Sequence, residues 1–252
     1  MTTTALALAA AWPREADAGV RPVVVETNVW GGDLATRCGA PYTPGLLDVA
    51  ATARQAQPGS LLGASAQLPS GVRVVVAPAG RGACREAVRV LAADAGRRVL
   101  TGEADDRGSV LLDVGRINED VAGLLNATDR VVLVTRGCPE ALTHVYAHLL
   151  SVGEEARRAS LVVVGPCVFP PGEITQALGV EDVTFLPWDV RGVTALVSQR
   201  RSVLRISGFR ATRLLAAAHD LARRIAGVAE PAGVVRQMRA ALAEAPGQGA
   251  GV

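Results

Sequence analysis

The chain has 252 residues, of which 49% are hydrophobic and 3% aromatic, and its formal net charge is +2. This size and hydrophobic content are enough to bury the core of one large α/β domain or of two small ones. No apolar run reaches the ~18 residues that a membrane-spanning helix needs. The scarcity of aromatic residues argues against a surface that stacks the bases of single-stranded nucleic acid.

All 26 basic residues are arginine, because the sequence contains no lysine. This excludes Schiff-base chemistry, a lysine general base and the lysine that reaches the phosphates in a P-loop. The four cysteines lie far apart without a CxxC pair, which is typical of reduced thiols in the cytosol. We therefore expect a cytoplasmic protein that has neither a disulfide framework nor a zinc site.

The chain opens with three threonines, Thr2 to Thr4, followed by an alanine- and leucine-rich run that stops at Trp12-Pro13. Threonine favours the N-cap position and alanine and leucine are strong helix formers, so this stretch predicts a helix. The N-terminus of such a helix is suited to binding an anion. The alternatives are a core helix without a ligand and a secretion signal, although the basic region of a signal is missing.

Further along the chain, short apolar runs alternate with longer helical patterns. Strands are expected at residues 22–26, 72–77, 109–113, 130–135, 160–164 and 183–186. Helices are expected at 45–55, 83–95, 119–127, 139–150, 170–179, 190–199, 204–226 and 233–244, with a loop at 59–71. This alternation predicts a doubly wound, mostly parallel sheet with helices on both faces. We expect residues 1–226 to form this α/β domain and residues 227–252 to form a C-terminal helix and a disordered tail.

Polar residues follow three of the expected strands, at the ends where parallel sheets bind ligands. These segments are Glu26 to Asp33, Asp113-Val114-Gly115 and Pro187-Trp188-Asp189. An acid that closes an apolar strand just before a glycine is typical of a carboxylate beside Mg²⁺ and a nucleotide phosphate. Each segment alone is also explained by ordinary turn chemistry.

The order of these features resembles the MinD/ParA family of P-loop ATPases, which includes the CpaE- and TadZ-like proteins of pilus assembly. The resemblance covers about residues 1–225. It implies a P-loop NTPase-like fold, ATP and Mg²⁺ as cofactors, and a homodimer. It further implies that Thr2 and Thr3 take the two hydroxyl positions of the phosphate loop. Thr2 and Asp113 would then hold Mg²⁺, and Pro187 and Asp189 would lie against the adenine.

The sequence also departs from the family pattern. Met1 stands where the phosphate-binding lysine is expected, and the glycine-rich loop and the strand before it are missing. Glu26 and Asn28 replace the usual pair of aspartates, and Gly165-Pro166 replaces an asparagine that reads adenine. We therefore expect a degenerate protein with at most weak ATPase activity. Since the missing strand is central in the family, we also expect two unpaired strand flanks, and a natural chain that starts upstream of Met1.

The C-terminal part of the chain is basic, with ten arginines and three acidic residues in 191–252. Seven of these arginines lie in Arg200–Arg224 among apolar residues. This pattern suits DNA phosphates, an anionic membrane or an acidic partner, or else a docked helix whose arginines are solvated or paired.

The expected function is degenerate nucleotide binding in cellular positioning, chromosome partitioning, or pilus and secretion assembly. Two alternatives remain open. One is a protein-interaction scaffold that keeps the fold without binding nucleotide. The other is an active ATPase whose P-loop is missing from this chain.

Overall fold

The structure is a computed structural model that describes residues 1–55, 61–101, 108–152, 159–180, 182–198 and 212–228. Its strands are β1 (Val23–Glu26), β2 (Ala66–Gln67), β3 (Arg73–Val75), β4 (Val110–Asp113), β5 (Val131–Arg136), β6 (Ala159–Val164) and β7 (Val183–Leu186). Its α-helices are α1 (Thr2–Ala10), α2 (Leu34–Cys38), α3 (Leu46–Arg54), α4 (Arg81–Ala92), α5 (Asp94–Thr101), α6 (Ala122–Asn126), α7 (Pro139–Val152), α8 (Pro171–Leu178), α9 (Val190–Val197) and α10 (Arg213–Ile225). Two short 3₁₀ turns are η1 (Asp17–Gly19) and η2 (Glu119–Val121).

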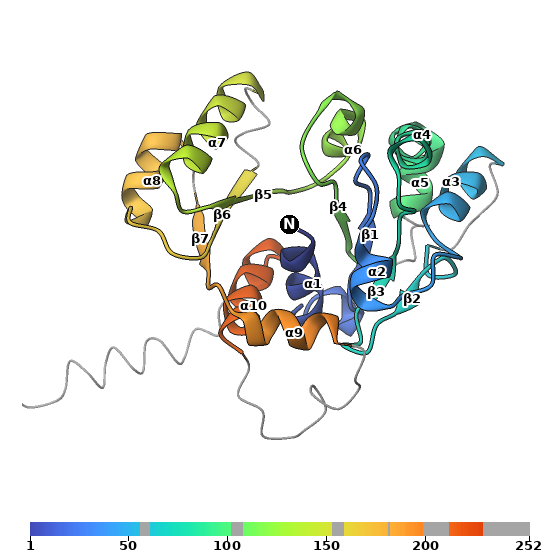
Figure 1. Cartoon of the computed structure of the whole chain (residues 1–252), viewed down its shortest axis with the longest axis horizontal. Helices are drawn as coiled ribbons and strands as arrows, with labels where there is room; N and C mark the ends of the chain where they lie inside the picture. Colours follow the sequence, from blue (N-terminus) through green and yellow to red (C-terminus); the bar gives the residue numbers. More distant parts are fainter. Residues whose placement is uncertain (56–60, 102–107, 153–158, 181, 199–211, 229–252) are drawn as a thin grey trace, which may run out of the picture.

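The strands form two sheets, with the orders β2-β3-β1-β4 and β5-β6-β7. Every pairing is parallel except that of β2 with β3. Helices lie on both faces of the strands, so the predicted doubly wound α/β architecture is confirmed (Figure 1). Within the described residues, β4 and β5 each pair on one side only, which confirms the expected pair of unpaired strand flanks.

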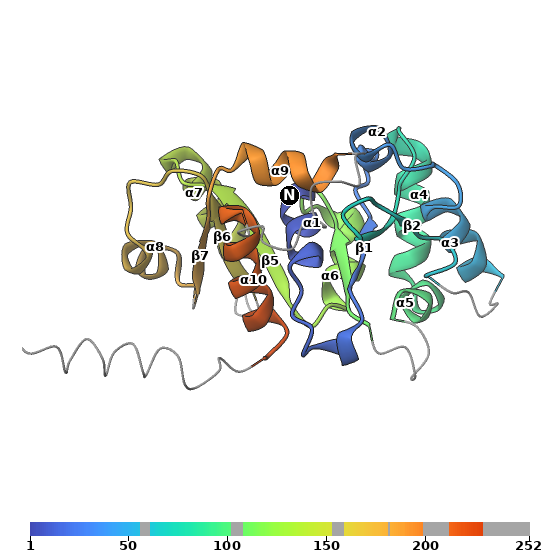
Figure 2. The same ribbon diagram turned by 90° about the horizontal axis from the view of Figure 1, so that it is seen from below.

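The two faces of the strands carry different cores. On one face lie α1, α9 and α10, packed against one another, as Figure 2 shows. A single apolar cluster on this face joins Leu6 of α1 to Val24 in the first sheet and Val162 in the second. On the other face the packing is divided. One cluster joins α3, α4, α5 and α6 to the first sheet, and a second joins α7 and α8 to the other sheet.

The strands also differ in how deeply they are buried. All four residues of β1 are buried, which is normal for a parallel strand flanked on both sides. In β4 only Asp113 is buried, and no residue of β5 is fully buried, although both strands are rich in valine and leucine. The partial exposure of apolar side chains therefore falls on β4 and β5, each of which is the end strand of its sheet within the described residues.

Several expected elements differ from the observed ones. Helices α2 and α5 were not predicted, and the expected loop at 59–71 contains the short strand β2. The helix expected at 204–226 begins, within the described residues, at Arg213, because the Thr212 hydroxyl accepts a hydrogen bond from the Leu215 N–H and caps the helix. The helix expected at 233–244 and the tail at 245–252 lie outside the described residues.

No helix in the described ranges is both long enough and apolar enough to cross a membrane. All four cysteines are unpaired thiols, which agrees with the absence of a disulfide framework.

Candidate functional site

The carboxyl ends of β1 and β4 bring two acidic residues together. Glu26 and Asp113 are direct register partners in these adjacent parallel strands. Val24 and Leu111, two residues earlier in each strand, pack in the cluster that contains α1. Because side chains alternate along a strand, Glu26 and Asp113 project to the same face as α1.

The Glu26 carboxylate is committed to the polypeptide backbone. It is 2% exposed, and its oxygens accept hydrogen bonds from the N–H groups of Asp33 (2.8 Å), Leu34 (3.1 Å) and Ala77 (2.9 Å). Burial raises the pKa of Glu26 above its ordinary value, and the three backbone hydrogen bonds oppose that rise. Glu26 therefore fastens the loop after β1 and the end of β3 to the sheet.

Asp113 contrasts with Glu26 because its carboxylate has no hydrogen bond or ion pair among the described residues, although it is only 6% exposed. Its carbonyl oxygen accepts the Thr27 N–H at 3.0 Å. The Thr27 hydroxyl is completely buried and also lacks a partner in the described structure. Nearby, Gly115 has a φ of +69°, and a Cβ there would meet the Asn28 side chain at 2.6 Å. The Thr27 hydroxyl thus remains buried and unsatisfied beside this strand end, next to a carboxylate that has no described protein partner.

The N-terminus of α1 is linked to α2 through an arginine. The Arg37 Nη2 donates a 2.9 Å hydrogen bond to the Thr3 hydroxyl, and its Nη1 lies 3.7 Å from an Asp33 carboxylate oxygen. Thr2 is half-buried, and Met1, the N-cap residue, gives α1 no side-chain cap. Arg37 was not among the predicted site residues, because 34 residues separate it from Thr3 and no local pattern marks such a contact.

The third predicted segment lies at the end of β7, in the second sheet. Asp189 is the N-cap of α9, where one carboxylate oxygen accepts the Gly192 N–H at 2.9 Å and the other accepts the Leu214 N–H of α10 at 3.2 Å. The hydrogen bond from Gly192 is the main reason that the pKa of Asp189 lies below its ordinary value. Asp189 therefore joins two helices in this structure. Its neighbour Trp188 is 67% exposed, and a Cβ at Gly165 would contact the Trp188 side chain at 3.7 Å.

Helix α1 relates these segments to one another. It contacts β1 and β4 on one side and α9 and α10 on the other. The structure therefore brings Thr2, Thr3 and Asp113 to one face of the first sheet. Pro187 and Asp189 lie across α1, at the end of β7 in the second sheet.

These residues fit part of a Mg²⁺–nucleotide site. A threonine hydroxyl and an unpaired carboxylate are oxygen ligands of the kind that Mg²⁺ prefers. A positive charge usually faces the phosphates, and this chain has no lysine to supply it. Arg37 places a guanidinium at the N-terminus of α1, where it donates a hydrogen bond to Thr3. No group of three or more histidine, cysteine, aspartate or glutamate side chains in the described ranges forms a separate metal site.

The basic C-terminal segment is described only from residue 212 onward. Helix α10 buries Leu214, Ala218, Leu221 and Ala222 in the cluster that contains α1. Arg223 lies 3.8 Å from Glu15, and Arg224 lies 3.7 Å from Asp182 and donates to the Thr184 hydroxyl. The described part of the segment is thus a docked helix in which Arg223 and Arg224 are paired, while residues 200–211 lie outside the described residues.

No family model matches the sequence, and no curated protein matches it significantly. Solved structures do match the fold. A ParA family ATPase from Chlorobium tepidum TLS aligns with a TM-score of 0.67 at 19% identity, covering 88% of this chain and 91% of its own. The septum site-determining protein MinD from Pyrococcus horikoshii OT3, complexed with Mg-ADP, aligns with a TM-score of 0.62 at 14% identity, covering 89% and 88%.

A MinC:MinD cell division protein complex from Aquifex aeolicus gives a TM-score of 0.59 at 16% identity, covering 91% of this chain and 92% of the other. Sequence identities of this size establish the fold alone. The chain therefore has the α/β fold of the MinD/ParA ATPases.

Proposed function

We propose that the protein is a degenerate, MinD/ParA-like nucleotide-binding protein that acts in cellular positioning, chromosome partitioning, or pilus and secretion assembly. It would work in the cytoplasm as a homodimer. The observation that carries the proposal is the unpaired Asp113 carboxylate, buried at a strand end on the face where α1 lies. Because this carboxylate makes no described hydrogen bond or ion pair, it does not hold the sheet together and is available to a ligand.

In this proposal, Thr2 and Asp113 hold Mg²⁺, the N–H groups at the start of α1 meet the phosphates, and Pro187 lies on the adenine side. Bound Mg²⁺ would neutralise the charge of the phosphates. Asp189 retains an indirect role, since it positions α9 and α10 beside α1. Because the chain has no lysine, we expect binding without appreciable hydrolysis.

Arg37 is proposed to supply the missing positive charge. Its guanidinium reaches the Thr3 hydroxyl, and its side chain remains 31% exposed, so it is accessible to a ligand at the start of α1. An arginine forms paired hydrogen bonds to phosphate oxygens, although it lacks the compact shape of a lysine ammonium.

Calorimetric titration of Mg-ATP into the protein tests the proposal. Binding that disappears in Asp113→Asn and weakens at least tenfold in Arg37→Gln would support it, with Arg98→Gln as the matched control, since Arg98 is an exposed arginine on α5. A phosphate-release assay then distinguishes binding from turnover. The proposal fails if the folded protein binds neither Mg-ATP nor Mg-ADP.

A second candidate is an interaction scaffold that keeps the fold without nucleotide. It is favoured because several polar groups of the predicted site segments already form hydrogen bonds within the protein. The Thr3 hydroxyl is bonded to Arg37, the Glu26 carboxylate to three backbone N–H groups, and the Asp189 carboxylate to two helices. The same titration separates the two functions, because a scaffold that does not bind nucleotide gives no heat of binding.

A further inference from the structure

A pocket lies at the C-terminal end of α1, away from the strand ends described above. It has a volume of about 630 Å³, which is in the usual range for small-molecule sites. Its lining consists of Ala10, Ala11, Trp12, Pro13, Arg14, Glu15, Gly19, Val20, Arg21 and His219. Arg21 lies two residues before β1, and the Asp17 carboxylate accepts the N–H of Ser109 just before β4, so the pocket sits at the amino ends of these strands.

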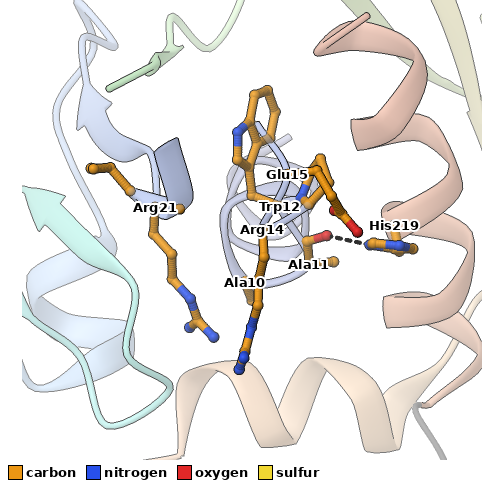
Figure 3. Close-up of a pocket in the computed structure, with 10 residues that line it drawn as sticks. Ala10, Ala11, Trp12, Arg14, Glu15, Arg21 and His219 are labelled. Atoms are coloured by element: carbon orange, nitrogen blue, oxygen red, sulfur yellow. Dashed lines mark hydrogen bonds between the residues drawn. The ribbon is translucent and has the colours of Figure 1, made fainter. Parts of the chain in front are cut away.

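Two arginines dominate the charge of this pocket. Figure 3 shows the Arg14 and Arg21 side chains extending in the same direction from different parts of the loop after α1. Arg14 makes no hydrogen bond or ion pair with any described residue, and Arg21 makes only a 3.4 Å hydrogen bond to the Ser70 carbonyl. The acid that lines the pocket, Glu15, lies 3.8 Å from Arg223 of α10. The lining therefore presents two guanidinium groups without a carboxylate partner among the described residues.

The walls of the pocket are fixed by internal hydrogen bonds. The His219 Nδ1 bonds to the Ala11 carbonyl at 2.7 Å, and because a carbonyl only accepts, Nδ1 is the donor. The indole N–H of Trp12 donates to Asp17 at 2.9 Å, and the same oxygen accepts the Ser109 N–H at 3.1 Å. These bonds connect the loop after α1 to α10 and to the start of β4.

The backbone of this loop is strained. Asp17 and Ala18 have φ values of 49° and 53°, a backbone conformation that residues other than glycine rarely adopt. Strain of this kind persists only where surrounding contacts enforce it, and it concentrates at ligand sites. The Asp17 hydrogen bonds supply that enforcement here, and they hold the segment between Arg14 and Arg21 in one shape.

We propose that this pocket binds a small organic anion, with a carboxylate or phosphate group held between Arg14 and Arg21. The apolar lining from Ala10, Pro13 and Val20 would accept the uncharged part of the ligand. A concave pocket of this volume with a few charged groups is suited to a small molecule rather than to a long polyanion. The inference is independent of the proposed nucleotide site, which lies at the opposite end of α1.

Phenyl phosphate is the probe, because it combines one anionic group with one apolar ring. The chain has three tryptophans, so the indole N–H signals in a ¹H–¹⁵N spectrum are assignable with Trp30→Phe and Trp188→Phe. We expect titration to shift the Trp12 signal saturably and to leave the other two unchanged. Benzyl alcohol, which lacks the charge, is expected to have no such effect.

The Arg14→Gln/Arg21→Gln variant should weaken the affinity at least tenfold, whereas Arg98→Gln should not change it. Both arginines are exposed, so we expect the variant to fold, which circular dichroism and thermal unfolding check. If the double variant does not fold, each single variant must weaken binding. An unshifted Trp12 signal, or an equal shift in the double variant, overturns the inference. Asp113→Asn should leave this titration unchanged, which separates the result from nucleotide binding.

Discussion

The two faces of the split sheet are held together in different ways. On the face of α1, one continuous core includes Val24 of the first sheet and Val162 and Leu186 of the second. On the opposite face, each sheet has a separate core. Since β4 and β5 do not pair within the described residues, the helices α1, α9 and α10 unite the two sheets, and strand hydrogen bonding does not.

The same comparison explains the different burial of similar strands. β1 reads Val-Val-Val-Glu and β4 reads Val-Leu-Leu-Asp, yet β1 is wholly buried and the apolar residues of β4 are half-buried. Burial in a parallel sheet is therefore set by the neighbours of a strand, and not by its own hydrophobicity. Unpaired flanks of this kind are the usual sites of added strands or aggregation.

The largest effect is expected for Glu26→Ala, which removes the polar anchor of the continuous face. It leaves the N–H groups of Asp33, Leu34 and Ala77 without an acceptor. Each unsatisfied buried donor costs about 1–3 kcal/mol, so we expect a loss of about 3–5 kcal/mol in the free energy of unfolding. Urea denaturation measures it, with the exposed Glu173→Ala as control. A loss below about 1 kcal/mol would contradict the anchoring role.

The pH dependence of the same site sharpens this prediction. Because burial raises the pKa of Glu26 above its ordinary 4.5, the native state binds this proton more tightly than the unfolded state does. The native protein should thus gain stability relative to Glu26→Gln as the pH falls. The gain should be complete below about pH 4.5 and be lost as the pH rises through the raised pKa. A pH-independent difference between the two proteins would be evidence against this buried state.

Leu6→Ala and Leu161→Ala test the two faces directly, because both side chains are 0% exposed but lie in different cores. Each should cost about 3 kcal/mol, the usual range being about 2–5 kcal/mol. In hydrogen exchange, Leu6→Ala should reduce the protection of both β1 and β6. Leu161→Ala should reduce that of β6 and leave β1 closer to normal. Identical protection patterns would show that both faces unite the sheets equally.

Asp189→Ala should cost about 1 kcal/mol through loss of the N-cap, measured by thermal unfolding. The carboxylate form is favoured in the native state, because the hydrogen bond from Gly192 lowers the pKa of Asp189 below 3.8. Its stabilisation is complete above about pH 3.8 and disappears as the pH falls through the lower native value. An unchanged melting temperature together with lost nucleotide binding would instead favour a direct adenine contact.

Asp113→Asn should have the smallest effect on folding, within about 0.5 kcal/mol. Its carboxylate has no described hydrogen bond or ion pair to lose, and asparagine preserves its volume. The binding of Mg-ATP should disappear in the same variant. Urea denaturation and calorimetry of one preparation measure both quantities. A large destabilisation would assign Asp113 a structural role like that of Glu26.

The order of strands and helices followed from local sequence signals. The short apolar runs, with Pro22 before the first and Pro187 after the second, placed β1 within one residue of its observed bounds and β7 at its observed bounds. Helix α5 was missed because Gly96 and the arginines around it do not form an apolar pattern. Its structure depends on tertiary packing, since a Cβ at Gly96 would lie 2.3 Å from the Leu91 Cα.

The candidate site was predicted less completely than the fold. Asp113 was found because an acid that closes an apolar strand is a local pattern. The hydrogen bonds from Ala77 to Glu26, from Arg37 to Thr3 and from Leu214 to Asp189 cross 51, 34 and 25 residues, respectively. No periodicity or short motif encodes such pairs. The sequence therefore did not distinguish Glu26 and Asp189, whose carboxylates accept backbone hydrogen bonds, from Asp113, whose carboxylate has no described partner.

Helix α1 has a consequence for communication within the molecule. It is about 13 Å long at 1.5 Å per residue, and Leu6, Ala7, Leu8 and Ala9 are almost completely enclosed. If a ligand displaces this helix as a unit, both of its ends move together. Linkage then requires each of two ligands, bound at opposite ends, to change the affinity of the other by the same factor.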